Sequence, residues 1–197
     1  AVTYTIGDGN ANGDFSGAIT QFGVVSVTKI GTGTQILSGD STYTGATTIN
    51  AGKLQVDGSL SASSAVTVNS DGTLGGSGTV GAVTVNDGGH LAPGSSPGTL
   101  NTGTLVLNAA SVLDFELGSL TGANDKVAVD GDLTLDGILN VTALTGFQAG
   151  QYTLLTYTGS LTDNGLSLGT MPGAFTYSID TATSGSVILN VVPEPAT

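Results

Sequence analysis

The chain has 197 residues, of which 32 are glycine, none is cysteine or tryptophan and only 9% are charged, whereas an ordinary globular domain carries roughly 25% charged residues. Fifteen acidic residues and three lysines give a net charge of −12, which repels phosphate-rich partners and so excludes nucleic acid and disfavours an anionic membrane. The hydrophobic fraction of 39% offers enough apolar surface to exclude a disordered chain.

The first predicted element is an N-terminal arm and cap, residues 1–14, in which the strand-forming "AVTYTI" precedes the glycine-rich "GDGNANGD". Alternating oxygen-bearing side chains in the second stretch fit the opening of a calcium loop, where such ligands surround the ion. The acid expected at the twelfth loop position is missing, because residue 19 is isoleucine. A calcium site and a plain glycine-rich turn both stay open, and no other cofactor is expected. The calcium ligands would be Asp8, Asn10, Asn12 and Asp14.

Residues 15–160 contain a repeat. Four segments, "TTIN", "VTVN", "VTVN" and "LVLN", superpose on an asparagine that recurs after 19, 17 and 22 residues. Apolar residues alternate with threonine in these segments, which is the pattern of a strand with one buried face. Glycine-rich corners such as "SDGTL" and "DGGHL" follow the strands and supply tight turns. The features together predict an all-β chain folded as a right-handed parallel β-helix, or β-solenoid, with coils about 4.8 Å apart.

The recurring asparagines are predicted to stack at one corner of the solenoid. Identical polar side chains in stacked strands can hydrogen-bond from one coil to the next. The alternative is that they only form turns, and both interpretations give the same fold. The ladder would comprise Asn50, Asn69, Asn86 and Asn108.

The C-terminal part divides into two segments. Residues 161–192 are dense in strand formers, and we expect them to form the last coils and a cap that covers the open β-edge. Residues 193–197, "PEPAT", contain two prolines. Each proline removes a backbone donor, so this segment is expected to leave the strand as a tail.

Residues 15–56 read "FSGAITQFGVVSVTKIGTGTQILSGDSTYTGATTINAGKLQV". This stretch resembles the autotransporter-associated β-strand repeat of passenger-like surface proteins. The resemblance implies a β-helical rod that is exported and displayed at the cell surface of a bacterium or in its extracellular matrix. The matching positions include Lys29, Gly31, Gly33, Leu37, Gly39, Tyr43, Gly45, Thr47, Ile49, Gly52 and Leu54.

The last residues, "VPEPAT", resemble the opening of the PEP-CTERM sorting signal. In that signal a transmembrane helix and a basic tail follow the motif, and an exosortase processes the protein during export. Neither part follows here, so a trimmed chain and a mature, processed form both stay open. The start at Ala1 fits a signal peptide that has already been removed.

Some β-helices are carbohydrate-active enzymes, and the acidic residues of this chain are the candidates for such chemistry. Glycoside hydrolysis needs two carboxylates about 5–10 Å apart, and "LDFE" places Asp114 and Glu116 on one face of a strand, with Asp130 and Asp132 near the next coil. The single histidine, His90, lies in the corner "NDGGHLAPG" and is interpreted as a turn residue. Three lysines are few for neutralising an acidic substrate, so we do not expect an enzyme.

The sequence therefore predicts an exported structural or adhesive element. Its terminal strands, "AVTYTI" and "SGSVILNVV", offer edges for head-to-tail self-association into a filament or matrix. Polysaccharide and other surface components are further expected partners. The alternative is a β-helix carbohydrate-active enzyme or a glycan-binding module.

Overall fold

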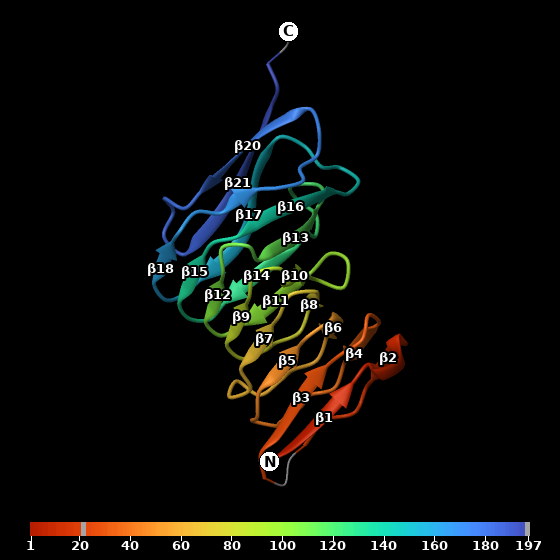
Figure 1. Ribbon diagram of the computed structural model, residues 1–197. Coiled ribbons are helices and arrows are strands. Elements are labelled where there is room, and N and C mark those ends of the chain that lie inside the picture. Colours follow the sequence, from red (N-terminus) through yellow and green to blue (C-terminus); the bar gives the residue numbers. More distant parts are fainter. Residues whose placement is uncertain (21–22, 196–197) are drawn as a thin grey trace.

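The computed structural model, which describes residues 1–20 and 23–195, is a stack of short strands with the N-terminus at one end and the C-terminus at the other (Figure 1). Within the described part of the chain, the strands form two sheets of eight strands and one of five. Neighbouring strands in both eight-stranded sheets are parallel. The predicted all-β, parallel β-helical fold is confirmed.

Each sheet is a row of strands in which every strand pairs with the next. Along its row, the first sheet contains β1 (Val2–Ile6), β3 (Val25–Lys29), β5 (Thr47–Ile49), β7 (Val66–Val68), β9 (Val83–Val85), β12 (Leu105–Leu107), β15 (Leu133–Leu135) and β18 (Leu161–Asp163). The second sheet contains β2 (Gly13–Phe15), β4 (Thr34–Leu37), β6 (Gly52–Val56), β8 (Gly72–Gly76), β10 (His90–Pro93), β13 (Val112–Leu117), β16 (Ile138–Ala143) and β19 (Ser167–Leu168). The third sheet contains β11 (Thr99–Thr102), β14 (Lys126–Val129), β17 (Gly150–Tyr157), β21 (Ser186–Pro193) and β20 (Phe175–Asp180). A short 3-10 helix, η1 (Asp8–Asn10), follows β1, and no helix among the described residues has the length and hydropathy needed to span a membrane.

The core forms because the period of two is kept from coil to coil. In β7, Val66 and Val68 are buried while Thr67 lies half-buried on the outer side. Residue by residue, β7 pairs with β9, so that Val66 lies beside Val83 and Thr67 beside Thr84. Apolar columns therefore run inside the solenoid and threonine columns run outside it.

Glycines allow the corners of successive coils to approach closely. Gly76 at the end of β8 has a φ of 106°, a conformation that L side chains rarely adopt. A side chain at this position would also collide with the backbone of Val56 in the preceding coil. The glycine-rich corners of the sequence are thus a requirement of coil stacking as well as of turning.

A lysine is buried at another corner. Lys29, the last residue of β3, is fully buried, and burial lowers the pKa of its ammonium group. Its Nζ donates to the carbonyl oxygens of Ile30, Gly31 and Ala51 at 2.7, 2.8 and 3.0 Å. These three carbonyls replace water around the ammonium group and tie two successive coils together.

The N-terminal arm predicted for residues 1–14 lies in the first coil. β1 pairs with β3 in parallel, with Val2 opposite Val25 and Tyr4 opposite Val27, and β2 pairs with β4. The alternation in "VTYTI" matches that in "VSVTK", which is why the two strands share one register.

The C-terminal end of the rod is built differently. β21 pairs in the antiparallel direction with both β17 and β20. An aromatic group gathers at this end, where the rings of Phe147 and Tyr152 stack at 5.3 Å and Phe175 meets Phe147 edge-on at 5.5 Å. Antiparallel strands and aromatic side chains thus cover the last coil of the core.

The expectation that residues 193–197 leave the strand is wrong for Pro193, which is the last residue of β21. The backbone N–H of Glu194 donates to Ala174 on the β20 side at 3.3 Å, so the nitrogen of Pro193 points to the opposite side. There the pairing with β17 has already ended at Val191. The missing donor of proline therefore breaks no strand pairing. The last two residues of the predicted tail lie outside the described part of the chain.

Candidate functional site

A polar groove of about 280 Å³ lies on the outer face of the second sheet. Its lining comes from β6, β10, β13, β16, the loop of residues 94–98 and Asp125, which directly precedes β14. Ser95 Oγ in that loop donates to Asp57 Oδ1 at 2.6 Å, and Gln55 Nε2 donates to Asp57 Oδ2 at 2.8 Å. These bonds hold the loop against β6. The charged residues that line the groove are Lys53, Asp114, Glu116 and Asp125.

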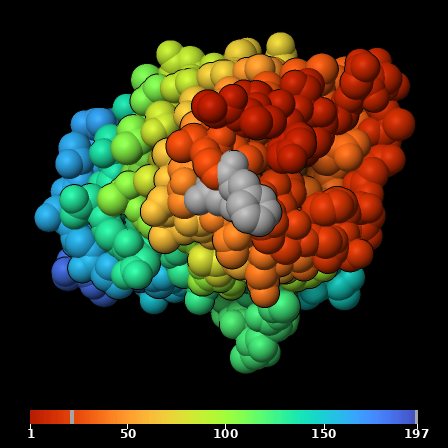
Figure 2. All heavy atoms as spheres, turned by 90° about the horizontal axis from the view of Figure 1, so that it is seen from below, coloured from red at the N-terminus to blue at the C-terminus, as the bar shows by residue number. Residues whose placement is uncertain are grey.

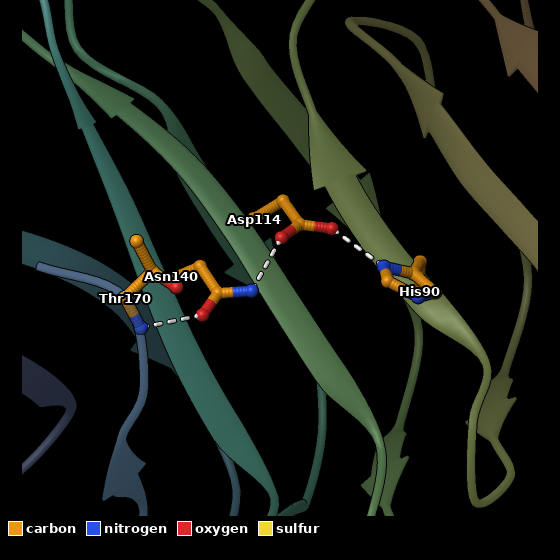
Figure 3. A network of polar contacts seen from close by, with 4 residues as sticks. All are labelled: His90, Asp114, Asn140 and Thr170. Atoms are coloured by element: carbon orange, nitrogen blue, oxygen red, sulfur yellow. Dashed lines mark hydrogen bonds and ion pairs between the residues drawn. The ribbon is translucent and has the colours of Figure 1, made fainter.

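Asp114 is held from both sides by neighbouring coils (Figure 3). His90 Nδ1 lies 2.7 Å from Asp114 Oδ2, and Asn140 Nδ2 donates to Asp114 Oδ1 at 2.9 Å. Asn140 Oδ1 in turn accepts the backbone N–H of Thr170 at 2.8 Å. In the neutral ring, donation from Nδ1 leaves Nε2 as the acceptor. The side chains of His90 and Asp114 are 38% and 39% exposed, so this network lies open to ligands.

The carboxyl group of Asp125 connects the loop of residues 94–98 to β13. Asp125 is only 2% exposed. Its carboxyl group accepts the backbone N–H of Gly98 at 2.9 Å and that of Glu116 at 2.7 Å. Burial raises the pKa of Asp125 to about 6, although the two N–H donors favour the charged form. The charge of Glu116 adds to the increase.

The Asp125 carboxyl makes the stability of the chain depend on pH. Its pKa is about 6 in the folded chain, against an ordinary value of 3.8, so the folded state keeps this proton to a higher pH than the unfolded state. Its stabilising contribution is therefore complete below about pH 4 and is lost as the pH rises through about 6. The expected loss is on the order of 3 kcal/mol.

The variant Asp125→Asn, which does not ionise, is expected to flatten this part of the stability profile. Urea unfolding measured at intervals between about pH 4 and pH 7 checks the slope. Asp130→Asn is the matched control because Asp130 is an exposed carboxylate. If the free energy of unfolding changed equally with pH in the wild-type chain and in Asp125→Asn, the pH dependence would not come from Asp125.

The groove suits polar binding better than acid–base catalysis. Both carboxylate oxygens of Asp114 and of Asp125 accept hydrogen bonds. Among the described residues, the carboxylate of Glu116 has no hydrogen-bond partner, and Lys53 supplies the one cation of the lining. Glycoside hydrolysis uses two carboxylates that both act on the substrate. Here Asp114 is engaged on both oxygens by His90 and Asn140, so Glu116 is the carboxylate of the pair that is free to accept hydrogen bonds from hydroxyl groups.

The structure brings together only one of the two predicted carboxylate pairs. Asp114 and Glu116 share the outward face of β13 and line the groove. Asp130 and Asp132 do not line it, and each accepts a hydrogen bond from the following coil, at 3.1 and 2.7 Å. These two residues thus join coils.

The interpretation of His90 as a turn residue is wrong. It is the first residue of β10, beside Thr73 and Val112 of the neighbouring strands, because the preceding glycines already complete the corner. Sequence reasoning missed Lys53 and Asp125 as groove residues. Asp125 follows Glu116 after an irregular loop, and no spacing rule links residues across such a loop.

The predicted calcium ligands accept hydrogen bonds in the structure. Asn10 Oδ1 and Asn12 Oδ1 accept the backbone N–H groups of Thr32 and Thr34 at 2.9 and 2.8 Å, which joins the first coil to the second. No group of three or more acidic, histidine or cysteine side chains among the described residues is placed to hold a metal ion. Calcium binding at this loop stays a prediction. The other two predicted ligands also accept hydrogen bonds. Asp8 accepts the backbone N–H of Gly9, and Asp14 accepts the hydroxyl of Ser38.

The four asparagines of the predicted ladder lie one above another. Each of the last three donates through Nδ2 to the amide oxygen of the asparagine in the preceding coil. The bonds are Asn69 to Asn50 at 2.7 Å, Asn86 to Asn69 at 2.8 Å and Asn108 to Asn86 at 3.1 Å. In the next coil, Asp136 follows β15 as Asn108 follows β12. Its Oδ1 accepts the backbone N–H of Gly137, so the ladder does not continue to this residue.

Replacing Asn86 by alanine is expected to lower the free energy of unfolding by about 1–3 kcal/mol, because two amide hydrogen bonds are lost. Chemical denaturation of the purified chain measures the change. Asn164→Ala, at an exposed position, serves as the control and is expected to change the stability by less than about 0.5 kcal/mol. If the ladder did not stabilise the fold, Asn86→Ala and Asn164→Ala would have the same free energy of unfolding.

The fold defines a class of protein, a β-solenoid. Residues 27–56, from within β3 to the end of β6, match the Passenger-associated-transport-repeat family. The chain is also 47% identical over 115 residues to the adhesin BmaC autotransporter of Brucella suis biovar 1 (strain 1330). This alignment covers 54% of the chain and 3% of that protein, so the chain spans a small part of the length of its relative.

Proposed function

We propose that this chain is an exported structural element of a bacterial surface or extracellular matrix, and that it acts by adhesion. The observation that carries the proposal is the passenger-type repeat at residues 27–56, which lies within a stack of parallel coils. The 47% identity to an autotransporter adhesin supports the same function. A rod with 9% charged residues presents a polar surface of low charge, which suits broad contact with glycans or with other surfaces.

Display of the chain on a bacterium that does not adhere by itself tests this function. Attachment to polysaccharide-coated and to uncoated surfaces is counted, with an unrelated β-rich domain of similar length as the control. Increased attachment is the expected result. Equal attachment of both strains on every surface would overturn the adhesive function.

The groove gives a second candidate function, the binding of neutral glycans. Glu116, Lys53 and the serines of the loop offer acceptors and donors for sugar hydroxyls. Glu116→Gln together with Lys53→Ala is expected to weaken oligosaccharide binding at least tenfold, whereas Asp130→Asn leaves it unchanged. If the wild-type chain released reducing ends from the oligosaccharide and Glu116→Gln did not, the groove would be a hydrolytic site and not a binding site.

The C-terminal motif supports a proposal about export. We take "VPEPAT" as the start of a sorting signal of the PEP-CTERM type. Replacement of Pro193 and Pro195 in the precursor, followed by fractionation of the cells and the medium, tests this. Unchanged processing and location of the variant would remove the motif from the sorting signal.

A further inference from the structure

A second hollow, the Lys126 hollow, lies on the outer face of the third sheet and shares no lining residue with the groove. It has a volume of about 400 Å³ and lies where β11, β14 and β17 run side by side. The loop of residues 118–125, which connects β13 to β14, forms one wall. Figure 2 shows the green part of the chain, to which this loop belongs, projecting from the side of the stacked coils. The lining residues with polar side chains are Thr99, Asn124, Lys126, Gln151, Tyr152 and Thr153.

Hydrogen bonds hold the wall of this hollow in one shape. Asn124 Oδ1 accepts the backbone N–H of Gly118 at 2.6 Å, and Asn124 Nδ2 donates to the carbonyl oxygen of Ser119 at 3.0 Å. The hydroxyl of Tyr152, a residue that is 3% exposed, lies 2.9 Å from the carbonyl oxygen of Gly118. A ligand therefore meets a hollow that is already formed, which lowers the entropy cost of binding.

Lys126 is the cation of this hollow, and its ammonium group is unpaired. Lys29 is bound by three carbonyl oxygens, and Lys53 shares the groove with three acidic residues. Within the described part of the chain, Lys126 makes no ion pair and no side-chain hydrogen bond, and no acidic residue lines its hollow. In a chain with 15 acidic residues and three lysines, this combination indicates a place for an anion.

Hydroxyl and amide groups surround the ammonium group. Thr99 lies beside Lys126 on the neighbouring strand, and Thr153 lines the hollow from β17. Among the described residues, neither threonine hydroxyl has a hydrogen-bond partner. Gln151 Nε2 donates to Asn190 at 2.9 Å, which leaves Oε1 of Gln151 as an acceptor. Leu120, which is 39% exposed, adds apolar surface to the wall, so the lining offers contacts for both the hydroxyl groups and the C–H face of a sugar ring.

The net charge of the chain limits how many charges the ligand can carry. The carboxyl group of the adjacent Asp125 lines the groove and not this hollow, so it does not oppose an anion next to Lys126. The rest of the surface is negative because the net charge is −12, and it repels a polyanion. Charges farther away than the Debye length, about 8 Å at physiological ionic strength, are largely screened. The hollow therefore favours one anionic group on an otherwise neutral ligand.

We propose that the Lys126 hollow binds an acidic sugar carried by an otherwise neutral glycan. The carboxylate of this sugar pairs with the Lys126 ammonium group in a charge-assisted hydrogen bond. Its hydroxyl groups bind Thr99, Thr153 and Gln151, and its ring packs against Leu120. The proposal rests neither on adhesion nor on the binding of neutral glycans in the groove.

Nuclear magnetic resonance titration of the full chain with methyl β-D-glucuronide tests the site. The neutral methyl β-D-glucoside and acetate are the comparison probes. Saturable binding of the glucuronide is expected, with an affinity about tenfold or more above that of either comparison probe, because the glucoside lacks the charge and acetate lacks the ring. Lys126→Gln is expected to weaken glucuronide binding about tenfold or more, whereas Lys126→Arg retains most of it. Circular dichroism checks the fold of each variant.

Asn164→Asp is the matched control, because it changes the net charge by the same one unit as Lys126→Gln. Asn164 is exposed and follows β18 of the first sheet, so glucuronide binding is expected to stay unchanged. The proposal would be overturned by equal affinities for the glucuronide and either comparison probe, by no binding at all, or by equal weakening in Lys126→Gln and Asn164→Asp. Loss of binding in the variant with Glu116→Gln and Lys53→Ala, but not in Lys126→Gln, would place the ligand in the groove and also overturn it. None of these results depends on whether the chain is adhesive.

Discussion

Replacing Lys29 by methionine is expected to lower the free energy of unfolding by about 2–4 kcal/mol. Methionine fills nearly the same volume, but it leaves the carbonyl oxygens of Ile30, Gly31 and Ala51 without the donor that now serves all three. Removal of a buried charge offsets part of this loss. The net effect is destabilising because the three acceptors belong to the backbone and stay where the coil places them.

Lys126→Met is the matched control. Lys126 is half-buried at the start of β14, and its replacement is expected to change the stability by less than about 0.5 kcal/mol. Chemical denaturation of both variants at neutral pH provides the comparison. If the Lys29 variant were as stable as the Lys126 variant, water would have to satisfy the three carbonyls equally well.

Phe115→Ala is expected to cost about 3–5 kcal/mol, the usual range for a large aromatic side chain removed from a core. Phe115 is 1% exposed and points inward from β13, between the outward-facing Asp114 and Glu116. For a chain of this length, the melting temperature should fall by roughly 6–20 °C. The groove residues on the outer face of β13 would then lose the packed layer that holds the strand in place.

Val112→Ala on the same strand separates core packing from strand pairing. Val112 is half-buried on the outward side of β13, so its truncation leaves no internal cavity and is expected to cost less than about 1 kcal/mol. Thermal unfolding followed by circular dichroism measures both variants. If both variants lost the same amount of stability, packing of Phe115 in the core would contribute little beyond the pairing of β13 with its neighbours.

The path of one coil follows from the sequence alone. In a solenoid each repeat contacts only its neighbours, so the alternation within one strand and the spacing to the next are enough to specify the pairing. The match of Val66 with Val83 and the stacking of Asn69 on Asn50 both connect like residues in successive repeats. Such contacts can be read from the chain because the repeat itself sets their register.

Which unlike residues meet depends on the tertiary structure. His90 reaches Asp114 across 24 residues and Asp125 supports Gly98 across 27, and the coils between them vary in length. A strand pattern also does not reveal whether a further coil lies beside it. Tyr4 has the same inward phase as Val27, yet it is exposed because no described strand covers β1 on its other side. Burial depends on neighbouring coils, whereas alternation depends on the strand alone.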